Sequence, residues 1–391
     1  MNGLKTVLTG NILPFWMEKM QDVEQGGFYG RMDGNGVLQK DATKGVVLNA
    51  RILWTFSAAY RLLGNQEYKR MACRAFEYIT THCMDTVHGG VYWELDYPGN
   101  PVNTKKQTYA QAFALYGFSE YYRATKNPEA LALAKDFFRL IEEKCRDNAH
   151  GGYLEAFTDD WQLIDDMRLS EKDANEKKTM NTHLHILEAY TNLYRIWPDK
   201  KVADAQRALI DIFTERIILR ETAHLQLFFN EKWEVKPSVV SYGHDIEASW
   251  LLYEAACVLN DVPLQERMKT LSLAMAAAVC EGLLPDGSLA YEHDDGCTDC
   301  ERHWWVQAEA VVGFWYAWKN SGNADFRQKA LRVWDYIDNQ LIDTDGGEWY
   351  WSRLADGSVN KKGDKAGFWK CPYHNGRMCM ELIHEKNEMK G

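Results

Sequence analysis

Histidines accompanied by carboxylates or amides stand near the starts of several apolar segments. His244 and Glu247 are three residues apart in SYGHDIEASW, and Asn181 and His185 are four apart in KTMNTHLHILEAY. On a helix, such spacings place both members of a pair on one face. Glu247 can then orient His244, and His374 follows in KCPYHNGRMC. Imidazoles with a pKa near neutrality predict proton-transfer chemistry in either direction.

Further polar and aromatic side chains occupy similar places in the other apolar segments. They are Arg51 in LNARILW, Tyr109 in KQTYAQAF, and Trp304, Trp305 and Glu309 in RHWWVQAEA. Aromatic rings suit either a helical core or a carbohydrate site.

A metal site is the main chemical alternative, because imidazole and carboxylate both bind zinc. His183 and His185 are two apart, which on a helix directs them to different faces, and the other candidates contain no chelating pair. Cys297-x-x-Cys300 has no second cysteine pair at usable spacing, so a mobile loop is predicted there. The sequence contains no Walker or dinucleotide-binding motif. We therefore predict neither a metal nor a cofactor.

Two series of turns divide the chain. The first comprises Leu-Gly-Asn65, Lys-Asn127-Pro, Trp-Pro-Asp199, Leu-Asn-Asp261 and Ser-Gly-Asn323, at intervals of 62, 72, 62 and 62 residues. Each can end one helix and cap the next. The second comprises Gly26-Gly27, Gly89-Gly90, Gly151-Gly152, Asp286-Gly287 and Gly346-Gly347, followed by alternating residues typical of β-hairpins. Its fourth member, expected near Leu225–Asn230, is missing.

The segments between these turns are helical and of two kinds. Six that are apolar nearly all round start near Val46, Lys106, Met180, Tyr242, His303 and Cys371, and six amphipathic ones start near Leu4, Gln66, Pro128, Lys200, Pro263 and Ala324. Six helical hairpins predict an all-α fold, an (α/α)6 barrel with short β-hairpins at the active-site mouth, in a single domain over residues 1–391. An open helical solenoid is the alternative.

The third repeat contains ten extra residues, which fall in the charge-rich segment 159–178. Charge-dense segments seldom pack, so a solvated loop is expected. A lid over the barrel mouth is the alternative, because long loops in compact domains often cover active sites.

Composition limits the partners. Acidic residues outnumber basic ones 56 to 45, giving a net charge of −11, which disfavours nucleic acid and anionic membranes. Nine cysteines, an odd number in a large chain, indicate free thiols in a reducing compartment. The N-terminus has no features of a secretion signal, and no apolar run is long enough to span a membrane. We expect a cytoplasmic monomer that binds a neutral small molecule.

The motifs resemble those of the N-acylglucosamine 2-epimerase superfamily, and within it the cellobiose 2-epimerases. They are GGFYG (26–30), ARILW (50–54), GGVYW (89–93), KTMN and LH and EAY within 178–190, SYGHDIEA (241–248), WWVQAEAVVGF (304–314) and WKCPYHNGRMC (369–379). The resemblance covers essentially the full length, and the last three motifs are the most specific. His183, where the family has an apolar residue, and Ala50, where others have a small polar one, depart from the pattern.

The resemblance implies an (α/α)6 barrel that epimerises or isomerises unmodified aldoses at C2 without metal or nicotinamide. In cellobiose 2-epimerases, the reducing-end glucose of a β-1,4-linked disaccharide, such as cellobiose or lactose, becomes mannose. By motif, His244 and His374 correspond to the acid/base pair on opposite faces of C2, and His185 to the histidine that assists at the ring oxygen or O1. Glu309 is expected to orient His374. The sugar-binding residues are expected to be Arg51, Tyr109, Asn181, Glu247, Trp304, Trp305, Glu309 and Trp369.

Other functions remain open on the same fold. A monosaccharide 2-epimerase or an aldose–ketose isomerase would act on mannose, glucose or an N-acylhexosamine. It would pass through the same cis-enediol intermediate as a cellobiose 2-epimerase. A sugar-binding protein without turnover is a more remote alternative, because a binder does not need two histidines that flank one carbon. His183→Ala is expected to have a mild effect.

Overall fold

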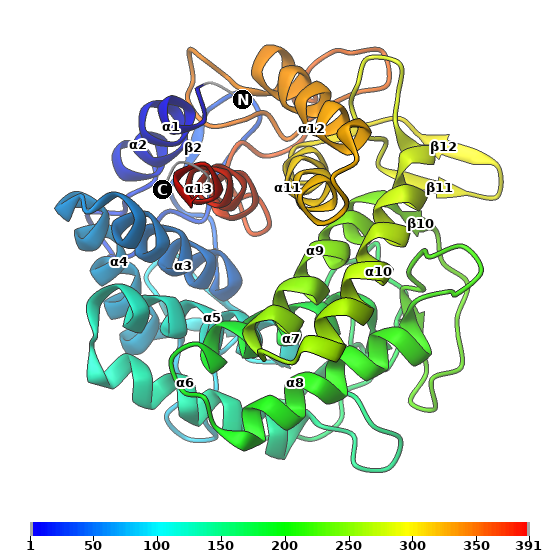
Figure 1. Ribbon diagram of the computed structural model, residues 1–391. Helices are drawn as coiled ribbons and strands as arrows, with labels where there is room; N and C mark the ends of the chain where they lie inside the picture. The colour runs from blue at the N-terminus through cyan, green and yellow to red at the C-terminus, as the bar shows by residue number, and fades with distance from the viewer. Residues whose placement is uncertain (1–2, 389–391) are drawn as a thin grey trace.

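The computed structural model describes residues 3–388, which form two concentric rings of helices (Figure 1). The inner ring consists of α3 (Val46–Leu63), α5 (Thr108–Thr125), α7 (Met180–Tyr194), α9 (Tyr242–Val258), α11 (Trp304–Ser321) and α13 (Tyr373–Glu388). Each inner helix contacts the next, and α13 contacts α3. The ring is therefore closed, which confirms the (α/α)6 barrel and excludes the open solenoid.

The outer ring begins in three pieces, α1 (Leu4–Val7), a π-helical turn (Leu8–Ile12) and α2 (Leu13–Glu18). It continues with α4 (Gln66–Tyr78), α6 (Pro128–Leu140), α8 (Lys200–Ile212), α10 (Val262–Ala278) and α12 (Ala324–Tyr336). The predicted turn residues cap these helices: a side-chain oxygen of Asn65, Asn127, Asp199, Asp261 and Asn323 accepts a backbone N–H of the first turn.

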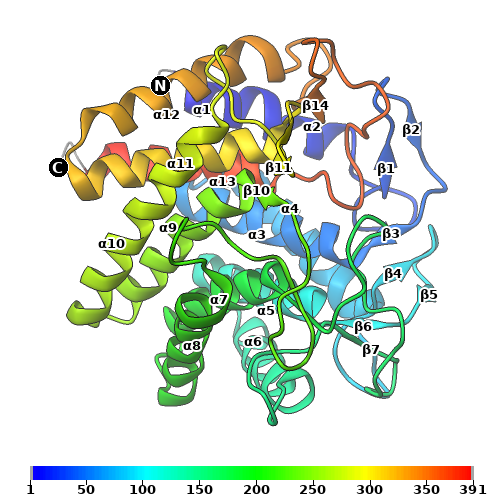
Figure 2. The same cartoon turned by 90° about the vertical axis from the view of Figure 1, so that its right-hand side faces the viewer.

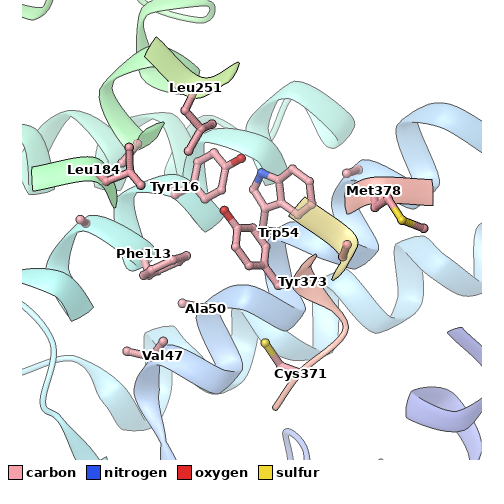
Figure 3. Close-up of a cluster of buried hydrophobic side chains, with 14 of the residues drawn as sticks. Val47, Ala50, Trp54, Phe113, Tyr116, Leu184, Leu251, Cys371, Tyr373 and Met378 are labelled. Atoms are coloured by element: carbon pink, nitrogen blue, oxygen red, sulfur yellow. The ribbon is translucent and has the colours of Figure 1, made fainter. Parts of the chain in front are cut away.

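Side chains of the inner helices pack against one another inside the barrel. Figure 3 shows Trp54 of α3, Tyr116 of α5 and Tyr373 of α13 pointing toward one another. The ring centroid of Trp54 lies 5.3 Å from that of Tyr116 and 5.3 Å from that of Tyr373. Such aromatic contacts exclude water and add to the stabilisation from apolar burial. They form a packed layer at the centre of the barrel.

Short strands gather at one end of the barrel, and the end of α13 lies toward the other (Figure 2). The strands are β1 (Arg31–Met32), β2 (Leu38–Gln39), β3 (Lys44–Gly45), β4 (Glu94–Leu95), β5 (Pro101–Asn103), β6 (Lys106–Gln107), β7 (Ala156–Phe157), β8 (Lys178–Thr179), β9 (Phe228–Phe229), β10 (Val240–Ser241), β11 (Glu292–Asp294), β12 (Cys297–Asp299), β13 (Arg302–His303) and β14 (Ser352–Arg353).

These strands join neighbouring repeats. The strand that leads into an inner helix pairs antiparallel with a strand of the following repeat, as in β3–β4, β6–β7, β8–β9, β10–β11 and β13–β14. The bridge between Met32 and Ala366 joins the last repeat to the first. The start of each inner helix, where the polar residues lie, is therefore held by backbone hydrogen bonds from the next repeat.

Two expectations about the hairpins were wrong. The fourth hairpin is present, with a bridge between Ile218 and Leu225, because Ala223 adopts the left-handed φ of 62° that glycine supplies elsewhere. The segment around Cys297 is the ordered hairpin β11–β12 rather than a mobile loop. Asp295 and Gly296 both have positive φ at its two-residue turn, which is the conformation that an Asp-Gly pair favours.

No helix within residues 3–388 has the length and apolarity needed to cross a membrane.

Candidate active site

Two corresponding positions of the six inner helices supply most of the predicted site residues, although some helices carry an apolar residue there. The first set, Leu48, Ala110, Thr182, His244, Val306 and His374, lies near the helix starts. The second set, three residues further, is Arg51, Phe113, His185, Glu247, Glu309 and Arg377. Because three residues are nearly one helical turn, the second set lies one layer deeper on the same face. The repeat thus brings the predicted histidines and their charged neighbours together.

His374 is held by a carboxylate from a neighbouring helix. Its Nδ1 lies 2.7 Å from Oε1 of Glu309, and Nε1 of Trp250 donates to the other carboxylate oxygen at 3.1 Å. Glu309 therefore orients His374 as predicted and leaves Nε2 available to a ligand. Burial lowers the pKa of His374 well below its usual value, and the nearby Arg51 guanidinium adds to the effect.

His244 has a neutral partner instead of a carboxylate. Its Nδ1 lies 2.8 Å from Oγ of Ser241, and burial lowers the pKa of His244 to about 3. The prediction that Glu247 orients His244 was wrong. Oε1 of Glu247 accepts a hydrogen bond from Nη2 of Arg377 at 2.6 Å and lies 3.8 Å from Nδ1 of His374. Arg377, which reaches in from α13, directs this carboxylate away from His244.

One indole ring contacts both histidines. The ring centroid of Trp305 is 4.8 Å from that of His244 and 5.6 Å from that of His374. Trp304 lies behind His374, with its centroid at 6.5 Å, and packs on Trp351 at 4.7 Å. Trp305 therefore borders both imidazoles, whereas buried Trp304 supports them from the wall.

His185 also has a carboxylate partner, which the sequence analysis missed. Its Nδ1 lies 2.9 Å from Oε2 of Glu188, and its ring contacts Tyr109 and Phe113 at centroid distances of 5.0 and 4.8 Å. Burial opposes ionisation of Glu188, but the charge of Arg377 and the hydrogen bond from His185 hold the pKa of Glu188 down to about 2. The three-residue spacing used for His244 and Glu247 would have found this pair.

Arg51 is a buried cation surrounded by aromatic faces. Its Nη2 donates to the Tyr109 hydroxyl at 2.6 Å, and its guanidinium carbon lies 4.3 Å from the Phe113 ring centroid and 5.0 Å from that of Tyr373. In the described part of the chain, no carboxylate lies within ion-pair distance of Arg51. Such a cation can stabilise negative charge that develops on a ligand.

A cluster at the base of the site tests the metal alternative. Among residues 3–385, whose side chains the structure describes, Glu247, Glu309 and His374 are the one group of potential metal ligands whose ligand atoms lie within 4.8 Å of one another. Nη2 of Arg377 donates to Glu247 at 2.6 Å and to Glu309 at 2.8 Å. The guanidinium group therefore already supplies the positive charge that a metal ion would bring to these carboxylates.

A cleft of about 570 Å³ leads from the mouth to His244. Asn181 lines it, and Oδ1 of Asn181 is buried without a hydrogen-bond partner among the described residues. Segment 167–174 contributes much of its wall, and Tyr291 and Glu292 close the other side. The extra segment of the third repeat therefore lies across the mouth, as the lid alternative requires.

A second cleft, of about 500 Å³, opens on the other side of the same segment. Trp93 and Trp369 line it together with Arg168 and Leu169. The Trp369 ring lies 5.9 Å from that of Tyr109. Trp369 is therefore near the mouth but lies apart from the tryptophans of α11.

His183 has a structural partner in each direction. Its Nε2 accepts the Tyr153 N–H at 3.0 Å, and its Nδ1 lies 2.7 Å from the Thr179 carbonyl. The corresponding residues of three other inner helices do the same, since Gln111, Asp245 and Gln307 accept N–H groups of Val91, Leu225 and Leu289. The histidine that departs from the family pattern thus anchors a hairpin and takes no part in the site.

The comparison with known proteins agrees with this arrangement. The model of the N-acylglucosamine 2-epimerase (GlcNAc 2-epimerase) family matches residues 27–375. The chain belongs to this family. The N-acylglucosamine 2-epimerase family thus accounts for nearly the whole chain, and it includes every predicted site residue.

Individual relatives narrow the position within the N-acylglucosamine 2-epimerase family. The chain is 56% identical over 380 residues to the cellobiose 2-epimerase of Bacteroides fragilis, with 97% of each chain covered. The solved structure of the cellobiose 2-epimerase from Bacillus thermoamylovorans is 44% identical, covers 98% of each chain and gives a TM-score of 0.95. The D-mannose isomerase of Marinomonas mediterranea is 23% identical over 97% of each chain. The predicted family and enzyme class, an isomerase, are confirmed.

Proposed function

We propose that the protein epimerises the reducing-end glucose of β-1,4-linked disaccharides, such as cellobiose and lactose, to mannose. The observation that carries the proposal is that the rings of His244 and His374, which come from different inner helices, both contact the Trp305 ring. Reversal of configuration at one carbon requires proton removal from one face and proton delivery to the other. Two imidazoles from corresponding helix positions are the simplest means of doing both.

Ring opening comes first and uses the third histidine. With Nδ1 held by Glu188, His185 presents Nε2 for proton exchange between the O1 hydroxyl and the ring oxygen. The products are an aldehyde at C1 and a hydroxyl at C5. Tyr109, which contacts His185 and accepts a hydrogen bond from Arg51, lies where it can orient that aldehyde.

The C2 step then transfers one proton in and one proton out. One histidine removes the C2 proton, the electron pair moves to O1 to give a cis-enediolate, and Arg51 stabilises the negative charge. The other histidine donates a proton to the opposite face, and the aldehyde re-forms. Burial disfavours the charged form of both rings. In one direction one of the two histidines is the base and the other is the acid, and they exchange roles in the other direction.

A disaccharide substrate requires space for its second sugar beside the site where C1 and C2 react. The cleft of about 570 Å³ that reaches His244 and Asn181 supplies it, with segment 167–174 as one wall. Glu247 and Glu309 lie beneath the histidines, and Trp305 is the ring best placed to stack on the reacting sugar. The named activity of the two cellobiose 2-epimerases supports a disaccharide.

The protein is also proposed to be cytoplasmic and monomeric. All nine cysteines are free, which suits a reducing compartment. The large apolar residues that are most exposed, among them Val23, Val87 and Val262, are distributed over separate repeats and do not suggest a subunit interface.

The test is incubation with cellobiose followed by sugar analysis. We expect glucosyl-mannose as the product, with deuterium at C2 when the reaction is run in D₂O, because the abstracted proton exchanges with solvent on the histidines. Absence of product from every β-1,4 disaccharide would reject the proposal. Product that retains all its hydrogen would reject the enediolate route.

A monosaccharide isomerase is the second candidate, supported by the identity of 23% to the D-mannose isomerase. Both reactions pass through the same enediolate and differ in which carbon receives the proton. Initial rates on mannose and cellobiose under identical conditions distinguish them, and a higher kcat/KM for mannose would favour this candidate.

A further inference from the structure

We propose that Arg377 is a positioning residue that couples the two histidine–glutamate pairs, His185–Glu188 and His374–Glu309. The inference rests on the proposed function, since it assigns a role within the same site. Arg377 is not proposed to transfer protons in place of either histidine. It acts through the carboxylates on which both imidazoles depend.

The geometry joins the pairs through one guanidinium group. Nη1 of Arg377 donates to Glu188, and Nη2 donates to Glu309 at 2.8 Å. These carboxylates also receive Nδ1 of His185 and Nδ1 of His374. Each carboxylate is therefore shared between one imidazole and the same cation.

Two further contacts fix the position of the guanidinium group. Nη2 also donates to Glu247 at 2.6 Å, and the Tyr373 hydroxyl contacts both Nη1 and Glu188. The Trp250 ring lies 4.8 Å from the guanidinium carbon. Arg377 is 1% exposed, so its planar group has one arrangement and no water to replace a lost partner.

The charges of the cluster explain why a cation is needed at this point. Three carboxyl groups from α7, α9 and α11 converge on Arg377, and without it their repulsion would be unopposed. Burial, together with repulsion by Glu309, raises the pKa of Glu247 to about 8, so its charged form is disfavoured beside the other two carboxylates. Glu188 and Glu309 then share the charge of Arg377.

The consequence is a limit on how far the carboxylates favour protonated imidazoles. The groups that face His374 from the surrounding helices are Arg51 (α3), Tyr109 (α5), His185 and Glu188 (α7), Glu247 (α9), Glu309 (α11), and Tyr373 and Arg377 (α13). Arg377 offsets the negative charge of this set and adds its own positive charge. It thereby lowers the pKa of His374 and His185 while leaving their Nδ1 atoms oriented.

The first test compares Arg377→Lys with wild type by titrating the histidine side chains in the substrate-free protein by NMR. Lysine keeps the charge but cannot bridge two carboxylates on opposite sides with one planar group. We expect the pKa of His374 or His185 to rise by about one unit, and the acid limb of kcat/KM to move upward equally. We expect kcat to fall about tenfold with KM for cellobiose within about twofold.

The matched control is Arg123→Lys, because Arg123 holds Glu120 and Asn192 within α5 and α7 without touching the site. We expect this control to lower the melting temperature without moving the histidine titration. If Arg377→Lys also loses stability and leaves the titration and pH profile unchanged, the role is structural and the proposal is rejected. The titration needs no substrate, so it is independent of the failure of the disaccharide assay.

A double-mutant cycle tests the coupling itself. Glu188→Gln and Glu309→Gln each remove one shared carboxylate. In the wild-type background their effects on kcat are expected to be non-additive by about fivefold, and in the Arg377→Lys background they are expected to be additive. Additive effects in both backgrounds would show that the pairs are independent and would overturn the proposal. If Arg377→Lys does not fold, additive effects of Glu188→Gln and Glu309→Gln in the wild-type background alone would overturn the proposal.

Discussion

At the scale of single residues, one helix position supplies chemistry in some repeats and packing in others. The position of His244 and His374 is occupied by Leu48, Ala110 and Val306 in other inner helices. The rings of His244 and His374 both contact Trp305. The identity of the side chain, and not the local backbone, therefore distinguishes the repeats that carry the proposed acid and base.

The first prediction concerns these two histidines. His244→Ala and His374→Ala should each lower kcat/KM for cellobiose by about 10²–10⁴-fold, the range for loss of a general acid or base. Circular dichroism should show intact helices, because each side chain contributes little to the core. Activity near that of wild type in either variant would contradict the two-base assignment.

The second prediction separates the structural histidine from the catalytic ones. His183→Ala leaves the buried Tyr153 N–H without its acceptor and should lower the free energy of unfolding by about 2–4 kcal/mol. The mild effect expected for His183→Ala therefore concerns kcat and not the free energy of unfolding. His183→Gln should retain most of the stability, because Gln111 and Gln307 perform this task in α5 and α11. A loss of kcat in His183→Gln would contradict a purely structural role.

The same glutamine variant isolates a pH effect. Burial lowers the pKa of His183 to about 4, whereas in the unfolded chain it is about 6.5. Between these values the unfolded state binds a proton that the native state does not, so wild type loses stability as the pH falls below about 6.5. His183→Gln lacks this loss. The unfolding free energy of His183→Gln minus that of wild type should therefore be about 2 kcal/mol larger at pH 5 than at pH 8. Denaturant titrations at the two pH values measure it, and a difference independent of pH would contradict the shift.

At the scale of elements, the sequence predicted what depends on local signals. The capping residues Asn65 and Asp199 mark where α4 and α8 begin, because cap preference is a property of the residue and its immediate neighbours. The fourth hairpin was missed because Ala223 adopts its positive φ only in the tertiary context. The Arg377 cluster was missed because it joins four helices that are far apart in the sequence.

The third prediction concerns the segment across the mouth. Its backbone is anchored by Gln107, which donates to the carbonyls of Met167 and Arg168, and Leu169 lines both clefts. Leu169→Ala should loosen the segment over the cleft and raise KM for cellobiose several-fold with little change in melting temperature. Leu163→Ala is the matched control, because Leu163 is 61% exposed in the same segment. Equal KM values for the two variants would reject a lid that contributes to substrate binding.

At the scale of the whole molecule, closure of the ring is what creates the site. His374 and Arg377 on α13 meet residues of α7, α9 and α11 only because the sixth repeat returns to the first. An open solenoid with the same repeats would expose both edge helices and separate these groups. The buried cluster, with its opposing charges, is therefore a product of the closed architecture.

The last prediction follows from a ring that has no structural ends. Helix α1 and the end of α13 lie away from the strands of the mouth (Figure 2), so a flexible linker can join the chain ends without crossing the site. A circular permutant opened between Lys126 and Asn127 keeps the Asn127 cap of α6 and all contacts around the ring. We expect it to unfold in one transition by both far-UV circular dichroism and tryptophan fluorescence, and to retain kcat/KM within about tenfold of wild type. A permutant opened between Glu171 and Lys172 should fold equally well but bind cellobiose more weakly, because the cut falls in the segment that lines the cleft. Two separate transitions in the first permutant would show that the repeats form more than one cooperative unit.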